Sequence, residues 1–313
     1  MNPKVSILMG VYNGEKAIGE TIENVLSQTF GDFEFIIVDD KSTDFTQDVI
    51  KKYSAKDSRV ILTKNKTNIG LTKSLNLGID LAQGDYIARI DAGDLWDKEK
   101  LGKQIKFLEE NKEYVVCGTR TFYVNEKGKI LSRSSDESIE DKDIRRDLFC
   151  RKAIFLHPSI VFRNIKIYYR EFFKYSQDLD LYARLFFKGK LYCLPEPLTY
   201  KVVSSNLTIE KKYYQRQYQN IAYKLFRERI KCGKDKLDMG KIFVIKKSKI
   251  GLRFCKLATS FLFAKPRISK KSFILSSSCL ILACLLYPPF MLDYSKRVAN
   301  IFFCRKLKLN SIK

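Results

Sequence analysis

Short apolar runs alternate with amphipathic segments over the first 111 residues, and this alternation restricts the fold more than any other feature of the sequence. Runs typical of buried strands cover residues 5–11, 33–38, 60–63 and 86–92. Helical spacing of apolar residues predicts helices over residues 15–28, from about 44, over 71–82 and over 97–111. Because strands that alternate with helices form doubly wound parallel sheets, the sequence predicts an α/β domain with a mostly parallel sheet.

Polar residues follow three of the predicted strands. The three clusters are Val11-Tyr12-Asn13, Asp39-Asp40 and the pair Asp91 and Asp94. Ligands of doubly wound sheets bind at the carboxyl ends of the strands, so these clusters predict one binding site at that edge. No glycine-rich GxGxxG or GK[ST] loop is present, so any bound phosphates would depend on a metal and on cationic side chains.

The spacing of Asp91 and Asp94 across an Ala-Gly step suits a divalent cation that bridges phosphate oxygens. Hard cations prefer carboxylate ligands, which supports this interpretation. The alternative is an ordinary surface turn, since Asp and Gly are common turn residues.

Three segments together resemble the family 2 glycosyltransferases. They are VSILMGVYNGE (5–15), FEFIIVDDKSTD (33–44) and NIGLTKSLNLGIDLAQGDYIARIDAGD (68–94). The resemblance covers about residues 3–203. It implies the GT-A fold and a nucleotide-diphosphate-sugar donor, here expected to be a UDP-sugar.

The resemblance also implies roles for single residues. The residues that would line the nucleoside pocket are Val11, Tyr12, Asn13 and Glu15. Asp40 would contact the base, Lys73 the phosphates or ribose, and Asp91 the ribose and the metal. The alternatives are a hydrophobic contact beside a helix start for Tyr12 and a solvated helix face for Lys73.

One residue departs from the family's metal motif. The family commonly has Asp-Ala-Asp-Asp, in which the third residue coordinates the cation, whereas this chain has Gly93 there. We expect Asp91 and Asp94 to bind the cation, Mn²⁺ or Mg²⁺, so that Asp94 substitutes for the missing ligand. The other interpretation is a weaker dependence on metal.

The segment YSQDLDLYARL (175–185) resembles the family's Glu-Asp-x-Asp helix start, with Gln177 in place of the glutamate. The resemblance implies a single inverting displacement in which Asp178 is the general base on the acceptor hydroxyl. The metal near Asp91 would stabilise the departing diphosphate. The alternative for Asp178 is a helix N-cap. Asp180 is expected to orient Arg184 at i+4.

Two other features concern the acceptor side. Residues 132–147 are a polar, charge-dense connection, interpreted as a mobile loop over the site. His157 precedes Pro158 in a segment that resembles the family's entry into the late strands. Both a hydrogen bond near the acceptor and a structural role fit this histidine.

The charge of the chain is uneven. The formal net charge is +23, and residues 204–313 contain 25 Lys/Arg and 5 Asp/Glu. We therefore predict a transferase domain over residues 1–203 and a basic, helical, membrane-associating region over 204–313. Its positive charge lies beside apolar stretches and no nucleic-acid motif occurs, so a nucleic-acid partner is not expected. The eight cysteines show no CxxC spacing and only one histidine is present, which argues against a zinc site.

Residues 272–292 form a stretch of 21 residues without charge, interrupted by Pro288-Pro289 and flanked by basic residues. A full span would move one basic flank across the membrane, against the positive-inside bias. A peripheral or re-entrant helix pair, a single span and an ordinary buried helix all remain open. The expected location is the cytoplasmic face of the plasma membrane, on an anionic surface.

The resemblance to family 2 implies an inverting glycosyltransferase that acts on a glycan or lipid-linked acceptor in the synthesis of capsule-like or O-antigen-like surface polysaccharide. Gly93 and Gln177 leave one alternative, a non-catalytic protein that binds sugar nucleotides or serves as a membrane scaffold.

Overall fold

The computed structural model describes residues 2–134, 138–152, 154–203, 209–241 and 243. The chain divides into two compact units, one of Met1–Ser205 with Tyr218–Lys241 and one of Asn206–Gln217 with Ile242–Lys313. The first unit therefore extends beyond the predicted boundary at residue 203 and includes residues 218–241.

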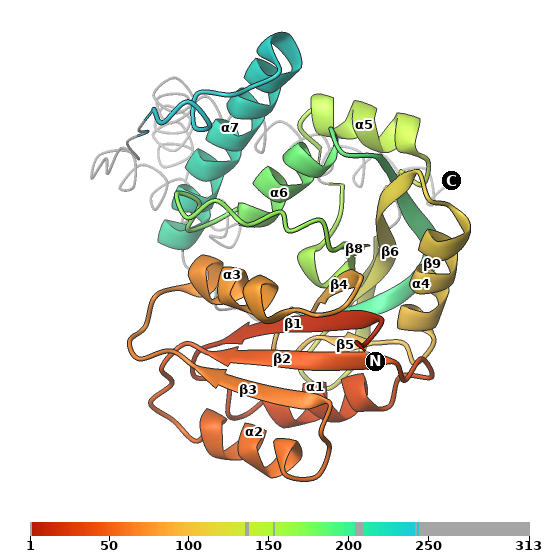
Figure 1. Ribbon diagram of the computed structural model, residues 1–313, viewed down its shortest axis with the longest axis vertical. Coiled ribbons are helices and arrows are strands. Elements are labelled where there is room, and N and C mark those ends of the chain that lie inside the picture. The colour runs from red at the N-terminus through yellow and green to blue at the C-terminus, as the bar shows by residue number, and fades with distance from the viewer. Residues whose placement is uncertain (1, 135–137, 153, 204–208, 242, 244–313) are drawn as a thin grey trace, which may run out of the picture. The chain divides into compact units, whose positions relative to one another are not determined.

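A nine-stranded sheet forms the centre of the first unit (Figure 1). Its strand order is β3-β2-β1-β4-β8-β6-β9-β5, and β7 pairs with β6. The strands are β1 (Val5–Val11), β2 (Phe33–Asp39), β3 (Val60–Lys64), β4 (Tyr86–Arg89), β5 (Leu95–Trp96), β6 (Tyr114–Val124), β7 (Ile130–Arg133), β8 (Val161–Arg163) and β9 (Lys190–Val202). The helices of this unit are α1 (Ile18–Leu26), α2 (Thr46–Ser54), α3 (Leu71–Leu81), α4 (Lys100–Glu110), α5 (Asp141–Phe149), α6 (Gln177–Leu185) and the part of α7 (Ile209–Cys232) from Tyr218 onward.

The α/β prediction is confirmed, and the mostly parallel sheet is confirmed in part: the described strands form a mixed sheet with four parallel pairings, the longest between β6 and β9, and four antiparallel ones. Strands β1 to β4 pair in parallel, as predicted. Beyond β4 the sheet becomes mixed, because β8 runs antiparallel to both β4 and β6, and β5 antiparallel to β9. Helices connect the first four strands and return the chain to the same edge of the sheet, whereas the direction of β8 is set by its antiparallel pairing with β4 and β6.

The parallel strands are covered on both faces. Ile7 and Met9 of β1 belong to the same buried cluster as Ile18 and Ile22 of α1. On the opposite face, Leu8 contacts Gly78 of α3. Figure 1 shows α1 and α2 on one side of β1–β3 and α3 on the other. Burial on both faces explains the continuous apolar runs of these strands.

The interpretation of residues 132–147 as a loop is wrong in its second half, because α5 begins at Asp141. Ile144 and Leu148 are four residues apart and fully buried, which gives this charged segment one apolar helical stripe.

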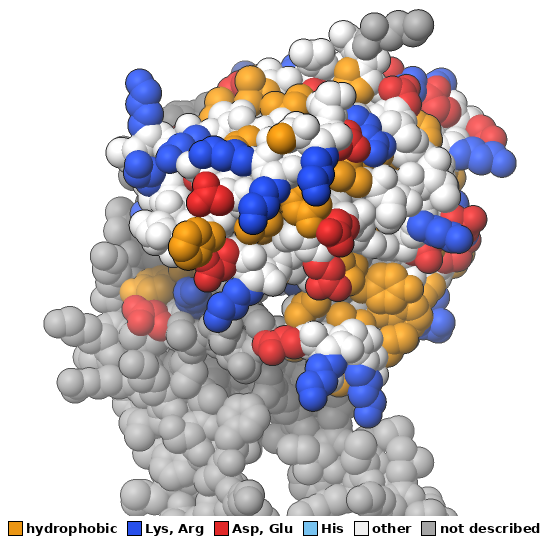
Figure 2. Space-filling view, turned by 90° about the horizontal axis from the view of Figure 1, so that it is seen from below, with side chains coloured by type: hydrophobic (Ala, Val, Ile, Leu, Met, Phe, Trp, Pro, Cys, Tyr) orange, Lys and Arg blue, Asp and Glu red, His pale blue; other side chains and the backbone are white. Residues whose placement is uncertain are grey.

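Figure 2 shows one face of the molecule, on which basic and acidic side chains are interspersed.

The predicted helix in the basic region is confirmed as α7. The Tyr218 ring packs against Phe172, Phe173 and Tyr175, with ring centroids 5.6, 6.0 and 5.9 Å away. Within the described part of the chain, no helix has both the length and the apolar character needed to cross a bilayer. The segment 272–292 lies outside the described residues.

Candidate functional site

A pocket of about 630 Å³ opens at the carboxyl end of β1. Its lining comes from the loop after β1, the loop after β2, the end of β4 and the end of β9. The lining residues are Gly10, Val11, Tyr12, Asn13, Gly14, Glu15, Lys16, Ala17, Asp44, Asp91, Ala92 and Lys201. Five of the residues predicted from the sequence, Val11, Tyr12, Asn13, Glu15 and Asp91, are among them.

Hydrogen bonds hold the loops after β1 and β2 together. Asn13 has a left-handed backbone (φ 53°), and its Oδ1 accepts a hydrogen bond from the Thr43 N–H at 2.9 Å. The Glu15 carboxylate accepts one from the Phe45 N–H at 2.9 Å. Tyr12 keeps 51% of its surface exposed, so its ring is free to stack on a planar group in the pocket.

Asp40 and Lys73 do not line this pocket. Asp40 is buried and accepts hydrogen bonds from the N–H groups of Ile69 and Gly70, both at 2.8 Å, which fixes the start of α3. Lys73 lies on α3 and forms an exposed ion pair with Glu171 at 3.3 Å. Their contacts with a nucleotide stay predictions.

Asp91 lies between two cations. One carboxylate oxygen faces the buried Arg89 guanidinium, and the other lies 3.6 Å from Lys201 Nζ. Burial opposes ionisation, but the positive charges of Arg89 and Lys201 outweigh it and hold the pKa of Asp91 below its usual range. Asp91 is therefore a carboxylate at neutral pH.

Asp94 does not line the pocket and is 2% exposed. Its Oδ2 accepts a hydrogen bond from Lys201 Nζ at 2.8 Å, and its Oδ1 accepts one from the Val202 N–H at 3.3 Å. Burial and the nearby Asp91 charge raise the pKa of Asp94 to about 6. Among the described residues, no group of three or more His, Cys, Asp or Glu side chains is arranged to bind a metal. The arrangement differs from the predicted two-carboxylate site, because Lys201 occupies the space between Asp91 and Asp94.

Asp178 lies in the first turn of α6, two residues after Ser176, which precedes the helix and has a left-handed backbone (φ 57°). Burial raises the pKa of Asp178, and the negative charge of Asp91 raises it further. The two carboxylates therefore lie close enough to interact electrostatically, although Asp178 does not line the pocket. A carboxylate with a raised pKa is better suited to accept a proton.

His157 is buried and its Nε2 lies 2.7 Å from the Tyr169 hydroxyl. Burial and the charge of Arg89 lower the pKa of His157 well below its usual value, so the imidazole is neutral at pH 7. Tyr182, one turn after Asp178, is also buried, and its hydroxyl has no hydrogen-bond partner among the residues that the structure describes. Buried polar groups thus gather beside Asp91 and Asp178.

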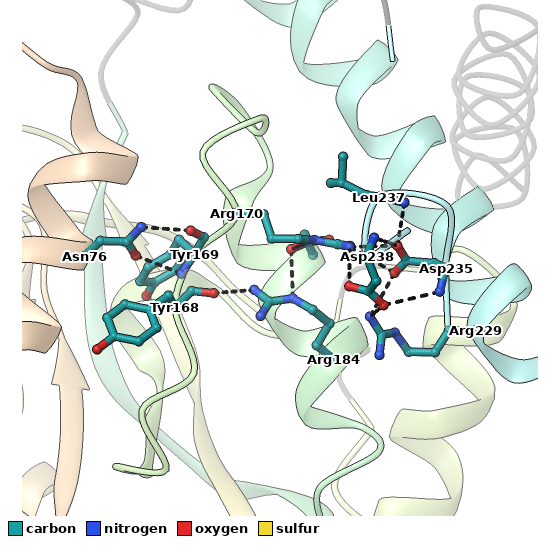
Figure 3. Close-up of polar contacts among 10 residues, drawn as sticks. Asn76, Tyr168, Tyr169, Arg170, Arg184, Arg229, Asp235, Leu237 and Asp238 are labelled. Atoms are coloured by element: carbon teal, nitrogen blue, oxygen red, sulfur yellow. Dashed lines mark hydrogen bonds and ion pairs between the residues drawn. The ribbon is translucent and has the colours of Figure 1, made fainter. Parts of the chain in front are cut away.

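Asp180 anchors α6 through hydrogen bonds with two arginines and is not a candidate for proton transfer. It accepts hydrogen bonds from Arg184 Nε, as the i+4 spacing predicts, and from Arg170 Nε, both at 3.0 Å. Arg170 also pairs with Asp235 at 2.8 Å. Figure 3 shows how this cluster connects α6 with the residues after α7, where Arg229 contacts Asp235 at 3.0 Å.

Two cationic residues of the site were not predicted from the sequence. Lys201 is separated from Asp94 by 107 positions, and nothing local marks it as a site residue. Arg89 did carry a sequence signal, because this charged residue ends the otherwise apolar strand Tyr86–Arg89, two residues before Asp91. In the structure it is fully buried. Such a charge requires a partner on the same face of the strand.

Comparisons with known proteins identify the family of the chain. The model of "Glycosyl transferase family 2" matches residues 6–175. The "Putative glycosyltransferase EpsE" of Bacillus subtilis is 37% identical over 225 residues, which cover 70% of this chain and 79% of EpsE. "UDP-Glc:alpha-D-GlcNAc-diphosphoundecaprenol beta-1,3-glucosyltransferase WfaP" of Escherichia coli is 43% identical over 110 residues, which cover 35% of this chain and 43% of WfaP.

Among solved structures, S. aureus TarS 1–349 in complex with UDP-GlcNAc superposes with a TM-score of 0.58 at 20% identity, covering 88% of this chain and 79% of that one. This likeness shows the GT-A-like fold, with its mixed sheet. The family model covers more than half of the chain, and EpsE is matched over most of its length. The chain therefore belongs to glycosyl transferase family 2 and is a glycosyltransferase.

Proposed function

We propose that the chain transfers a sugar from a UDP-sugar to a hydroxyl group of a glycan or lipid-linked acceptor during the synthesis of surface polysaccharide, with inversion at the anomeric carbon. The observation that carries the proposal is the pocket at the carboxyl end of β1, which the loop after β1 and the ionised Asp91 line. Asp178 lies in the first turn of α6, outside this lining, and the charge of Asp91 acts on it. A UDP-sugar donor is supported by two similar proteins, WfaP, which is named for transfer from UDP-Glc, and TarS, whose structure was solved with UDP-GlcNAc.

The proposed step is one displacement. Asp178 accepts the proton of the acceptor hydroxyl while that oxygen forms a bond to the anomeric carbon. The bond from this carbon to the β-phosphate oxygen breaks, and its electron pair leaves with the nucleoside diphosphate. A carboxylate suits this role because sugar hydroxyls are weak acids that lose the proton only as the new bond forms.

The donor side is formed by the loop after β1. The exposed Tyr12 ring would stack on the base, and the fixed turn at Asn13 and Gly14 would hold the ribose and phosphates. The residues present do not fit the predicted divalent cation bound by two carboxylate ligands. Both oxygens of Asp94 already accept hydrogen bonds from Lys201 and Val202.

The mutation Asp178→Asn tests the proposal. We expect turnover to fall by about 10²–10⁴-fold, because the base is lost, while the Kd for the donor changes less than about threefold. Donors are first selected from UDP-Glc, UDP-GlcNAc and GDP-Man by thermal stabilisation. Turnover is then measured as release of the nucleoside diphosphate, with membrane lipid extract as acceptor.

The matched control is Asp143→Asn, which removes a carboxylate from the exposed pair with Arg146 on α5. It should leave both constants unchanged. Turnover by Asp178→Asn within about threefold of the wild type would remove Asp178 from the mechanism. Failure of every donor to bind would contradict the proposed donor class.

We further propose that the basic region 204–313 associates with an anionic membrane at the cytoplasmic face. Its excess of Lys/Arg beside apolar stretches supports this. The full chain should float with liposomes that contain anionic lipid, and much less with neutral ones. Equal flotation with both would contradict an electrostatic contribution.

A further inference from the structure

Lys201 connects the far end of the sheet to the donor pocket. It is the penultimate residue of β9, yet it lines the same pocket as the loop after β1. Its side chain is 32% exposed, so the ammonium group is partly open to a ligand. The nearby charges of Asp91 and Asp94 keep the pKa of Lys201 above its usual value in spite of burial, so this lysine is charged at neutral pH.

The ammonium group of Lys201 lies between the carboxylates of Asp91 and Asp94, where a divalent cation was predicted from the sequence. Nζ lies 2.8 Å from Asp94 and 3.6 Å from Asp91. Arg89 contacts the other oxygen of Asp91. The carboxylates of Asp91 and Asp94 are thus paired with the positive charges of Arg89 and Lys201. A divalent cation bound by both carboxylates would lie next to Lys201 Nζ and would be repelled by it.

The backbone at Gly93 supports the same conclusion. This glycine replaces the third, metal-coordinating residue of the family motif, and its φ is +94°. Its N–H donates a hydrogen bond to Thr21 Oγ1 at 2.9 Å, which holds this conformation. A residue with a side chain would be strained at this φ. The local backbone is therefore built for glycine, not for a carboxylate ligand.

From these observations, we propose that Lys201 binds the diphosphate of the donor and supplies the positive charge that a divalent cation supplies in metal-dependent enzymes. The inference rests on the proposed function, since it assumes a nucleoside diphosphate in this pocket. An ammonium group offers three donors to phosphate oxygens. Asp91 and Asp94 then act as positioning residues that hold Nζ at the inner end of the pocket. Lys16, which also lines the pocket, adds a second positive charge.

Isothermal titration with UDP, GDP, UMP, GMP and inorganic pyrophosphate, in EDTA and in millimolar Mn²⁺, tests the inference. For the wild type, we expect binding of at least one nucleoside diphosphate in EDTA, with a Kd that Mn²⁺ changes less than about threefold. Lys201→Met should weaken diphosphate binding in EDTA by about tenfold or more, and monophosphate binding much less. Mn²⁺ should restore part of the loss, because removal of the ammonium group frees the two carboxylates for the cation.

Two further variants keep the test valid if Lys201→Met does not fold. Lys201→Arg retains the charge and should bind within about threefold of the wild type. The double variant Lys201→Met with Asp94→Asn avoids leaving a buried carboxylate unpaired, and should show the loss without rescue by Mn²⁺. The control is Lys190→Met, which removes an exposed lysine from the same strand and should bind like the wild type.

The possible failures are distinguishable. Diphosphate binding that is unchanged in both variants lacking Lys201 would overturn this inference alone, as would wild-type binding that disappears in EDTA. A wild type that binds no nucleoside diphosphate under either condition would overturn the proposed function together with the inference.

Discussion

Lys100, which lies at the start of α4, makes the stability of the protein depend on pH in a way that can be calculated. Its side chain is fully buried. Nζ donates a hydrogen bond to Gln104 Oε1 at 2.7 Å and lies 3.9 Å from the centre of the Trp96 ring. Burial lowers the pKa of Lys100 to about 7 from its usual 10.5. In the unfolded chain the lysine regains its ordinary pKa and is protonated at pH 7.

The size of the effect follows from the difference between the two pKa values. At 1.36 kcal/mol per pKa unit, folding costs about 4–5 kcal/mol at pH 7 or below because of this lysine. Between about pH 7 and 10.5 the unfolded state binds more protons than the folded state, so the free energy of unfolding rises with pH. Lys100→Met removes the cost but leaves Gln104 Oε1 without a partner, which costs about 1–3 kcal/mol.

We therefore expect Lys100→Met to be more stable than the wild type by about 1–3 kcal/mol at pH 7. Near pH 10 the advantage should disappear or reverse, because the cost of burying the neutral lysine then falls to about 1 kcal/mol, no more than the cost of the unpaired Gln104 Oε1. Urea unfolding at the two pH values measures this difference, and other titrating groups cancel between the two proteins. Lys106→Met, at an exposed position of the same helix, should change stability by less than about 0.5 kcal/mol at either pH.

Two results would refute the reasoning about Lys100. One is a variant that is less stable than the wild type at pH 7. The other is a stability difference that stays the same at both pH values, which would mean that the charge of Lys100 does not limit stability.

Two further substitutions test the packing around the site. Gly84→Ala should destabilise the protein by about 1–3 kcal/mol, because an added Cβ would lie 2.5 Å from the Ser6 backbone nitrogen; a melting temperature like that of the wild type would contradict the close approach. Asp180→Asn should destabilise it by about 3 kcal/mol, because Arg170 and Arg184 lose their buried partner. Chemical denaturation measures this loss, and a change below about 1 kcal/mol would show that the ion-pair cluster contributes little.

The first half of the fold was predictable because its signals are local. Strands β1, β2 and β4 are buried on both faces and therefore form continuous apolar runs, whereas the edge strand β3 is partly exposed. Helix α3 was predicted within one residue of its observed Leu71–Leu81. Helix α5 was missed because only Ile144 and Leu148 mark its buried side among many charged residues. The directions of β8 and β5 depend on pairings with distant strands, which no local pattern records.

The site divides in the same way. The loop after β1 and Asp91 follow predicted strands, so their placement around one pocket could be foreseen from strand ends. The place of Lys201 in the pocket could not be foreseen, because it depends on β9, a strand near the opposite end of the strand order from β3. The metal prediction depended on the spacing of Asp91 and Asp94 alone. Spacing does not reveal that a lysine from a distant strand fills the gap between two acids.

The residues after α7 set a practical limit on how short an active version of this enzyme can be. Composition changes near residue 203, and a chain cut there would lose Tyr218, which covers Phe172 and Phe173. It would also lose Asp235, the second carboxylate held by Arg170. The charge of Arg170 would then be paired only with Asp180. The helix that begins with Gln177 and Asp178 would lose the ion pairs that connect it to the residues after α7. A truncated enzyme intended for kinetic work should therefore retain the chain through residue 241.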